Sequence, residues 1–302
     1  APLSDYTFAN NIIWLSQKSG FYQIIEDCFC LFSLHGQCLT MLLPPLGEAA
    51  NQPRALRACF EIMDGYNPGP YLSVVEFVYR DFVQVLEAEA SDWLVERSLP
   101  DYIYATSDLI ELKGNAYKTK RSEINQFRRV HPNHRMETLG PQHWDGIRAL
   151  IDTWLKNRIQ YLSADAIADF FYTVEQERRA IERALAHYDT LGLEGLCLYI
   201  DDKLEGFTFG ERLNRDVANV LIEKTNFNIQ GAAQFLFQVD LEFPERAGNF
   251  CLGETNLDAA QVRAVVINLA LDDEQAGIRT CLRQGLRELL GSYAGAISGD
   301  VR

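Results

Sequence analysis

An α+β fold built from two related halves is predicted by three observations. Short stretches in which apolar and polar residues alternate, typical of strands, stand between longer stretches with helical periodicity. A run of strands, a glycine-containing loop and a helix occur in this order twice. The 302 residues, of which 47% are hydrophobic, suffice for two cores. We therefore expect two tightly packed units, 1–130 and 131–302, because no linker rich in Pro, Gly or Ser separates them.

The first half is predicted to begin with an antiparallel meander. Residues 21–45 alternate in hydrophobicity around a turn at His35-Gly36. The loop LPPLGEAANQ then leads into a helix from about Pro53 to Met63, since proline is favoured in a first helical turn. The rest of this half reads as a strand, a short helix and two strands at 71–78, 79–87, 93–98 and 101–105.

The second half repeats this plan after two long helices. The helices are predicted at 140–158 and 165–191, each with an apolar stripe at helical spacing. Residues 196–224 read as three antiparallel strands with turns at Asp201-Asp202 and at 214–216. The loop TNFNIQGAAQ then enters a helix from about Ala232 to Phe243.

One basic segment stands out in an acidic chain. Between Lys113 and Arg135 there are seven basic residues and one acid, Glu123, a net charge of +6, whereas the whole chain carries −14. Fixed donors in such a segment suit a phosphate or carboxylate group. Ion pairs with acids elsewhere in the fold are the structural alternative, which we rank equally.

If residues 117–130 form a helix, two kinds of side chain lie next to each other. The polar stripe consists of Lys118, Arg121, Asn125 and Arg128. The adjacent apolar stripe consists of Tyr117, Ile124 and Phe127. A basic row that borders a buried face is expected at the edge of a ligand site.

The second loop has its own chemical signal. A strand that ends in Glu223 is followed by Asn226, Gln230 and Gly231 and then by a helix, whose first N–H groups suit a pyrophosphate or another anion. The structural alternatives are that Gly231 only permits a tight helix entry and that Glu223 is an ordinary edge-strand carboxylate.

Other classes of site find little support. The seven cysteines form no CxxC pair, and Pro132 breaks helical geometry between His131 and His134, so we predict no disulfide framework and no metal. No apolar run approaches the roughly 18 residues of a membrane-spanning helix, so integral membrane association is not expected. The first ten residues lack the pattern of a secretion signal, and we predict a cytoplasmic location.

Several motifs together resemble a known bacterial family. DYIYATSDLIELKGNAYKTKRSEINQF, SDYTFANNIIW, LLPPLGE, GFTFGE and IEKTNFNIQGAAQ are similar to the pattern of an uncharacterised family related to the C-terminal synthase domain of phosphatidylglycerol lysyltransferase, the multiple peptide resistance factor. More distantly, the group resembles the Fem peptidoglycan aminoacyltransferases. The resemblance implies two fused N-acetyltransferase-like units.

The resemblance also implies which residues form the site, and it shows one place where this sequence departs from the family pattern. Those that match the hallmark or second-loop pattern are Lys113, Tyr117, Lys120, Arg121, Asn125, Phe127, Glu223, Asn226 and Gly231. Towards the C-terminus, where the family has an Asn-Arg-Glu run, one register keeps only Glu254 and another places Gly285-Leu286-Arg287 at the end of the pattern. A missing Asn-Arg pair would put transferase activity in doubt.

Relatives with assigned activity transfer an aminoacyl group from aminoacyl-tRNA. We therefore predict an acyltransferase with acyl-CoA or aminoacyl-tRNA as the donor, an amine or hydroxyl acceptor and no permanently bound cofactor. Glu223 and Glu254 are candidate proton acceptors. The alternative is an inactive fold that binds a ligand or regulates a partner. The negative charge of the rest of the chain argues against DNA binding, but it permits a local contact between the basic segment and a tRNA backbone.

Overall fold

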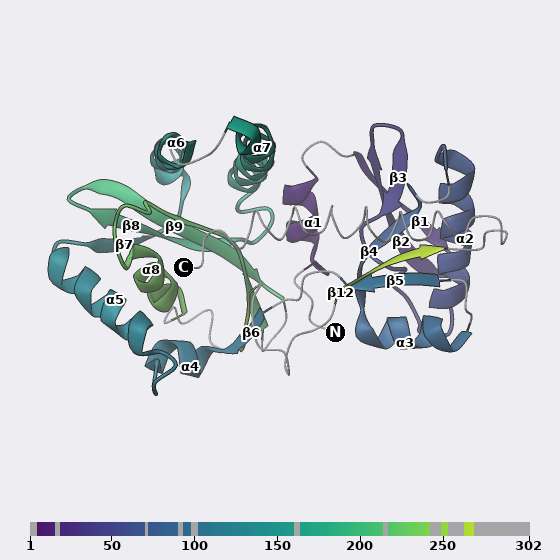
Figure 1. Ribbon diagram of the computed structural model, residues 1–302, viewed down its shortest axis with the longest axis horizontal. Coiled ribbons are helices and arrows are strands. Elements are labelled where there is room, and N and C mark those ends of the chain that lie inside the picture. Colours follow the sequence, from purple (N-terminus) through teal and green to yellow (C-terminus); the bar gives the residue numbers. More distant parts are fainter. Residues whose placement is uncertain are drawn as a thin grey trace.

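Two six-stranded mixed sheets, each with packed helices, form the framework of the protein (Figure 1). The computed structural model describes residues 5–15, 19–69, 72–89, 93–97, 102–159, 164–213, 217–241, 249–252 and 263–268. Its elements in chain order are α1 (Phe8–Trp14), β1 (Ser19–Ile25), β2 (Cys28–His35), β3 (Cys38–Met41), α2 (Gln52–Tyr66), β4 (Val74–Tyr79), α3 (Arg80–Glu89), β5 (Trp93–Arg97), β6 (Tyr102–Ala105), α4 (Thr106–Glu111), α5 (Lys118–Val130), β7 (Arg135–Thr138), the short 3-10 helix η2 (Pro141–His143), α6 (Trp144–Ile159), α7 (Ala164–Ala186), β8 (Glu194–Ile200), β9 (Lys203–Arg212), β10 (Val217–Thr225), α8 (Ala232–Leu241), β11 (Asn249–Leu252) and β12 (Arg263–Asn268).

The two sheets are built on one plan, as the repeated sequence pattern predicts. The strand order is β1-β2-β3-β4-β12-β5 in the first sheet and β6-β11-β10-β9-β8-β7 in the second. In the first, β1, β2 and β3 form an antiparallel meander, α2 follows, and β4 returns parallel to β3. In the second, β8, β9 and β10 form the meander, α8 follows, and β11 returns parallel to β10. The predicted α+β class is confirmed.

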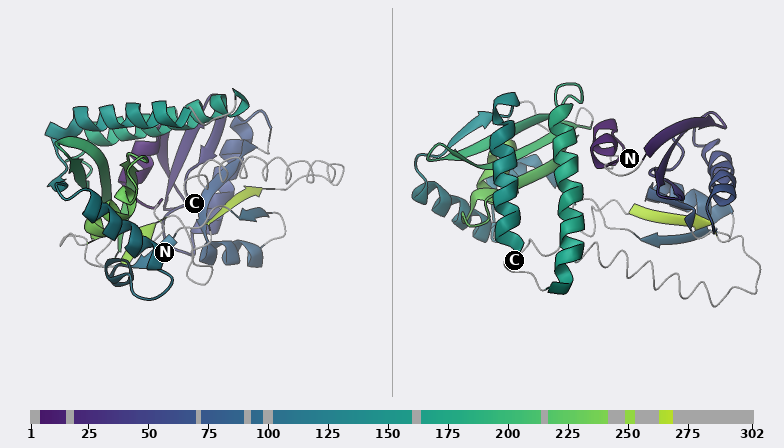
Figure 2. Two further views of the ribbon diagram at one scale, coloured as in Figure 1. Left: turned by 60° about the vertical axis from the view of Figure 1, so that its left-hand side comes forward. Right: turned by 90° about the horizontal axis from the view of Figure 1, so that it is seen from above.

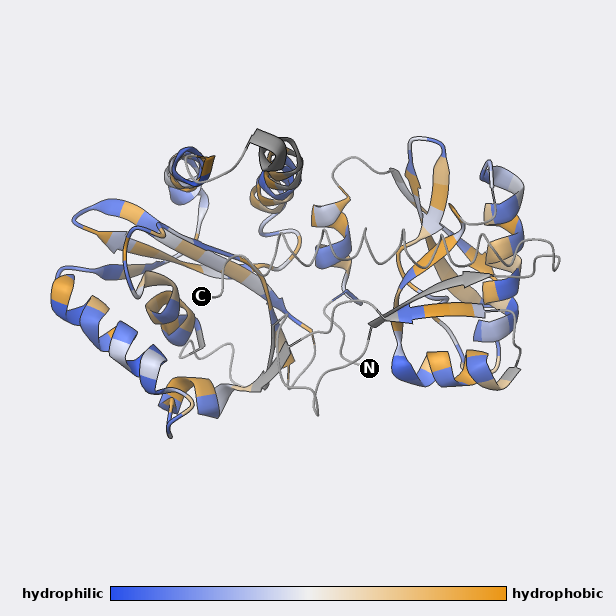
Figure 3. Cartoon of the chain, viewed as in Figure 1, coloured by the Kyte–Doolittle hydropathy of each residue, from blue (hydrophilic) through white to orange (hydrophobic). Residues whose placement is uncertain are grey.

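The helices pack on the two sheets through separate apolar clusters. In the first half, Phe32 of β2 packs with Phe60 and Met63 of α2, all at most 1% exposed. In the second half, α6 and α7 cover one face of the sheet, whereas α4, α5 and α8 lie on the other (Figure 1, Figure 2). Phe207 belongs to the cluster under α6 and α7, and Leu198 belongs to the cluster under α8. Hydrophobic residues accordingly follow the strands, while α5 is mainly hydrophilic (Figure 3).

The halves exchange one strand each. β6 precedes the second meander in the chain, yet it pairs with β11 at the edge of the second sheet. β12 follows the second meander, yet it pairs with β4 and β5 inside the first sheet. A division of the chain at residue 130 remains a prediction, and in the structure α5 packs on α8 of the second half.

The N-terminal segment connects the two halves. α1 packs against α7, and Arg183 of α7 donates to the carbonyl oxygen of Ile12 at 2.8 Å. Thr7 donates its hydroxyl to Glu211 of β9. On the other side, the Tyr6 hydroxyl donates to the carbonyl oxygen of Phe77 in β4 at 2.8 Å. The segment therefore ties the second sheet to the first, as Figure 1 shows for α1 between the halves.

The two long helices differ slightly from their predicted limits. The first begins with a 3-10 turn, η2, in which Pro141 stands, and continues as α6. The second ends at Ala186, five residues earlier than expected, because residues 187–192 form successive turns that end at Gly192 with a φ of 63°. In the part of the chain that is described, no helix is long and apolar enough to cross a bilayer.

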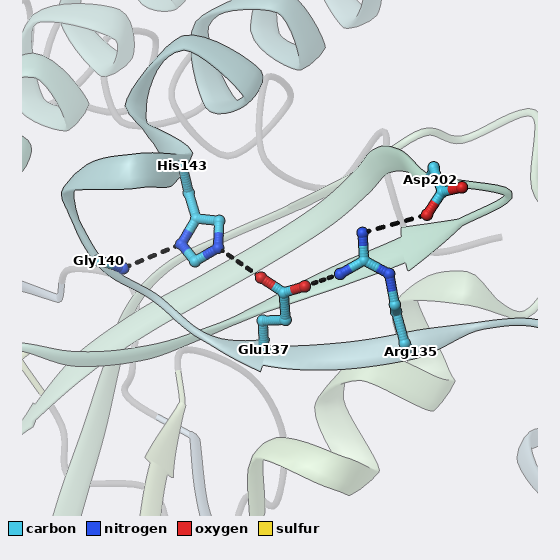
Figure 4. A network of polar contacts seen from close by, with 5 residues as sticks. All are labelled: Arg135, Glu137, Gly140, His143 and Asp202. Carbon is cyan, nitrogen blue, oxygen red and sulfur yellow. Dashed lines mark hydrogen bonds and ion pairs between the residues drawn. The ribbon is translucent and has the colours of Figure 1, made fainter.

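A buried histidine joins β7 to the start of α6 (Figure 4). His143 is 2% exposed; its Nδ1 accepts from the backbone N–H of Gly140 at 3.1 Å, and its Nε2 lies 2.9 Å from Glu137. Arg135 pairs with the same carboxylate and reaches Asp202 at 3.4 Å. Because Nδ1 accepts, the ring is neutral with its proton on Nε2.

The His143→Gln variant is expected to weaken the acid sensitivity of folding. Burial lowers the pKa of His143, so below about pH 6.5 the unfolded chain binds a proton that the folded protein does not. Stability is therefore lost as pH falls below that value. Glutamine can keep both hydrogen bonds but cannot titrate. Urea unfolding of both proteins at pH 5 and pH 7.5 should show a smaller difference for the variant; an equal difference would contradict this role.

Candidate functional site

β10 and β11 pair over a short distance and then separate. Their parallel register covers Val217–Asn219 of β10 and Asn249–Cys251 of β11. β10 continues to Thr225 and stays paired with β9, with an irregularity between Val220 and Ile222 that is typical of a β-bulge. Among the described strands, none pairs with the second half of β10 on the β11 side. Backbone groups beside an opening of this kind are available to a ligand.

The loop after β10 is held by a buried carboxylate. Glu205 is 7% exposed and accepts from Asn226 Nδ2 at 2.9 Å and from Lys203 Nζ at 2.6 Å. Its carbonyl oxygen also accepts from the backbone N–H of Asn226 at 2.8 Å. Asn226 Oδ1 in turn accepts from the backbone N–H of Asn228 at 3.1 Å. Both polar ends of the Asn226 side chain therefore fix the loop that begins α8.

The basic segment and the second loop, predicted separately, meet in the structure. Gly231 has a φ of 81°, and a Cβ atom at this position would lie 2.4 Å from the carbonyl oxygen of Glu123 in α5. Beside it, Gln126 donates to Gln230 at 3.1 Å. Phe127 and Phe235 stack with ring centroids 4.6 Å apart. Gly231 is thus required both for its backbone conformation and for the close approach of α5 and α8.

Two of the basic residues that were predicted to bind a ligand contact the protein itself. Arg121 donates through Nη1 to the carbonyl oxygens of Leu112 and Gly114, the latter at 2.8 Å. These acceptors end α4 and form the turn before α5, so Arg121 closes that turn. Arg128 donates to Gln238 at 3.2 Å and lies over the ring of Phe235.

The other predicted residues of the basic segment are mostly exposed. Tyr117 is half-buried between two apolar clusters, whereas Lys118, Lys120 and Asn125 are exposed. Lys113 is also exposed and pairs with Glu111 at 2.8 Å. The predicted polar stripe is therefore split, because Arg121 and Arg128 contact the protein while Lys118 and Asn125 face solvent. Glu254 lies outside the described residues.

The Arg121→Met and Lys120→Met variants should separate structural from ligand-binding roles. Arg121→Met leaves two carbonyl oxygens without a charged donor, and we expect it to lower the free energy of unfolding by about 1–3 kcal/mol. Lys120→Met changes an exposed side chain and should stay within about 0.5 kcal/mol of the parent. Urea unfolding measures both. Equal stability of the two variants would show that Arg121 does not support the turn.

Glu223 is the most unusual carboxylate of the described chain segments. The residue is half-buried, but its Oε2 is inaccessible to solvent and has no hydrogen-bond partner among the described residues. Burial first, and then the neighbouring Asp240, raise the pKa of Glu223 to about 8, although Lys224 opposes the shift. Its register partner on β9 is Thr208, fully buried, whose hydroxyl has no partner in the same set of residues. A carboxyl that titrates near neutral pH suits proton transfer.

Three polar residues near this carboxyl or its loop, Asp240, Thr208 and Glu205, carry only weak sequence signals. Asp240 is 0% exposed and lies in the apolar run FLFQVDL, so a lone acid in a buried helix was the available signal. Thr208 stands between two phenylalanines of β9, where alternation predicts that it faces α8 and not their cluster. The role of Glu205 depends on a contact with Asn226 that no local pattern reveals.

The equivalent position in the first half is occupied by the protein's own side chains. Gln52 at the start of α2 is 6% exposed and donates to the carbonyl oxygen of Pro45 at 2.9 Å. Its Oε1 accepts from the Tyr79 hydroxyl at 3.2 Å. Both polar ends of the Gln52 side chain are therefore satisfied internally, which favours the second half as the seat of a ligand.

Solved structures with this architecture cover nearly the whole chain. A conserved protein of unknown function from Bacteroides thetaiotaomicron VPI-5482 matches with a TM-score of 0.73 and 24% identity over 88% of this chain and 91% of that one. The C-terminal domain of a protein assigned as a lysylphosphatidylglycerol synthetase from Agrobacterium fabrum matches with a TM-score of 0.60 and 12% identity over 87% and 88%. L-PGS from Bacillus licheniformis gives 0.59 and 12% over 90% of each chain. At these identities the likeness shows the fold.

The fold, together with the family that the sequence matches, supports an acyltransferase-like class of protein. The chain belongs to the family described as phosphatidylglycerol lysyltransferase, C-terminal, which matches residues 2–261. The predicted family relationship is therefore confirmed. Among curated proteins, none matches the sequence significantly.

Proposed function

We propose that the protein transfers an aminoacyl or acyl group from aminoacyl-tRNA or acyl-CoA to an amine or hydroxyl acceptor. The observation that carries this proposal is the buried carboxyl of Glu223 on β10, beyond the point where β11 separates and just before the loop that enters α8. Family membership supports the same class of reaction.

The site residues supply orientation and a proton acceptor. The acceptor nitrogen or oxygen attacks the acyl carbonyl carbon of the donor, and its proton passes to the Glu223 carboxylate. The new C–N or C–O bond forms as the ester or thioester bond to the carrier breaks, and the carrier leaves with its oxygen or sulfur. Phosphate groups of either donor suit the N-terminus of α8, whose entry loop is fixed by Asn226 and Glu205. No covalent enzyme intermediate is needed, because positioning and charge stabilisation supply the rate.

The test is a transfer assay with the full chain. Purified protein is mixed with radiolabelled acyl-CoA or with tRNA charged with a labelled amino acid, together with a panel of amines and hydroxyl compounds. Label is expected in an acceptor product in the presence of the protein. Failure to transfer label and to bind either donor would remove the proposal. Saturable binding of a donor without product would instead support the alternative of an inactive, ligand-binding or regulatory protein.

A further inference from the structure

Strand β1 forms an open edge of the first sheet. All seven of its residues pair with β2 in one continuous register, and none of the described strands pairs with its other side. Natural sheets protect such edges with charged residues, prolines, bulges or very short strands, because an unpaired edge attracts another strand. The sequence SGFYQII of β1 contains no charged residue and no proline. The usual protection is therefore missing from this strand.

The other edge strands of the two sheets differ from β1. At the far side of the first sheet, β5 carries Glu96 and Arg97. In the second sheet, the edge strand β7 carries Arg135 and Glu137, and the edge strand β6 has only four residues. β1 is thus the longest of the four edge strands, and it combines that length with a lack of charge.

Alternate residues of β1 present backbone groups at the open edge. On β2, Phe29 exchanges backbone hydrogen bonds with Leu46, on the side away from β1. The even-numbered residues of β2 therefore bond to β1, and their register partners there are the odd-numbered residues. The N–H and C=O groups of Gly20, Tyr22 and Ile24 consequently point outward, where a further strand can pair with them.

Large apolar side chains flank the open edge on both faces of the sheet. Phe21 is 45% exposed, Tyr22 66% and Ile24 59%. Phe21 stacks on Phe32, which packs under α2. Tyr22 and Ile24 lie on the opposite face, because successive side chains of a strand alternate. A second strand at this edge would cover apolar groups on both faces.

Helix α2 extends the apolar surface on one face. Phe60 and Arg57 of α2 contact the ring of Trp93 in β5. Ile62 and Tyr66, which are 40% and 53% exposed, lie on the opposite flank of this helix. Because β5 and β1 stand at opposite ends of the first sheet, that flank lies towards β1, which α2 also contacts.

The size and charge of this surface suit a second copy of the chain. At their observed exposures, and at about 150–250 Å² per aromatic side chain, Phe21, Tyr22 and Tyr66 together expose roughly 250–400 Å². With Ile24, Ile62 and the strand edge, two copies would bury about 1,000 Å² in total, the lower limit of a specific interface. Two chains of net charge −14 repel each other, and β1 lets them approach without placing like charges opposite each other.

We propose that two copies of the chain associate through β1, paired antiparallel about a twofold axis. The register that pairs all seven residues places Tyr22 opposite Tyr22 of the second copy, and Gly20 opposite Ile24. Glycine leaves room for the isoleucine side chain. This pairing uses the open edge of both chains, so it closes at a dimer. Glu223 lies on the other sheet and is not part of the surface (Figure 1).

Sedimentation equilibrium of the full chain, from about 1 to 100 μM, tests the dimer. Tyr22→Lys places two like charges directly opposite each other, and the dissociation constant of the dimer should rise at least about tenfold. The matched control is Phe171→Lys, which replaces a 44% exposed aromatic residue of α7 and should leave that constant unchanged. A parent chain that stays monomeric at the highest concentration would overturn the proposal, as would equal dissociation constants for the two variants.

Cysteine cross-linking tests the register without depending on the lysine variants. Directly opposite residues of an antiparallel pair have Cα atoms about 4.5–5.5 Å apart, within reach of a disulfide. Under mild oxidation, Tyr22→Cys should therefore form a covalent dimer, whereas Gln23→Cys, which faces Phe21 of the second copy, should not. The parent chain, oxidised in the same way, accounts for the native cysteines. Equal cross-linking at the two positions, or none at residue 22, would contradict the twofold pairing of β1.

Discussion

The Glu223→Gln variant is expected to lose acyl transfer and to become more stable than the parent at alkaline pH. Glutamine has the shape of glutamate but cannot accept a proton, so kcat should fall by about 10²–10⁴. The pKa of Glu223 is raised to about 8 in the folded protein, against about 4.3 in an unfolded chain. The folded state therefore binds the extra proton between these values, and stability falls as pH rises through that window.

Two measurements check this prediction together. Urea unfolding at pH 5 and at pH 8.5 should show a clearly larger gain in stability of the variant over the parent at the higher pH. The parent's rate should rise with pH through the pKa of Glu223. A variant that keeps full activity would remove Glu223 as proton acceptor, and an equal stability difference at both pH values would show that the carboxyl is solvated.

The Gly231→Ala variant should separate α5 from α8. Its Cβ atom would lie 2.4 Å from the carbonyl oxygen of Glu123, and the residue would keep a φ of 81° that L-residues rarely adopt. Backbone strain and overpacking together should lower the free energy of unfolding by about 2–5 kcal/mol. Donor binding should weaken with it, because the loop that begins α8 moves away from α5.

Gly114 provides the matched control. It has a φ of 85°, but a Cβ atom there meets nothing within 4 Å. The Gly114→Ala variant should therefore cost only the backbone term, about 1–2 kcal/mol. If chemical unfolding gave the same loss for both variants, the contact between Gly231 and Glu123 would have no energetic role.

Most elements of the fold were predictable because their signals are local. Alternating residues produced the meanders β1-β2-β3 and β8-β9-β10, and helical periodicity produced α5 with Ile124 and Phe127 buried. The exchange of β6 and β12 was not predictable, because a strand pattern does not say with which distant strand it pairs. Sheet membership is decided by burial and edge pairing over the whole chain.

In the candidate site, the two segments could be predicted from the sequence, but the contacts between them could not. The loop at Gly231 and a helix over 117–130 were predicted separately, and the structure places the loop in contact with α5. The hydrogen bonds of Arg121 could not be predicted, because its acceptors are backbone carbonyl oxygens, which every residue possesses. The influence of Asp240 on Glu223 was hidden for a related reason, since it depends on how α8 lies across β10.

The exchanged strand β12 has a consequence for biosynthesis. β4 ends at Tyr79, but β12, which pairs with it on the side towards β5, begins only at Arg263. Because the ribosome delivers the chain from the N-terminus, β4 and β5 have no strand between them while the entire second meander is being made. The first sheet is complete only after translation has passed Asn268, so a nascent chain carries open strand edges for most of its synthesis, and these edges are where premature association would begin.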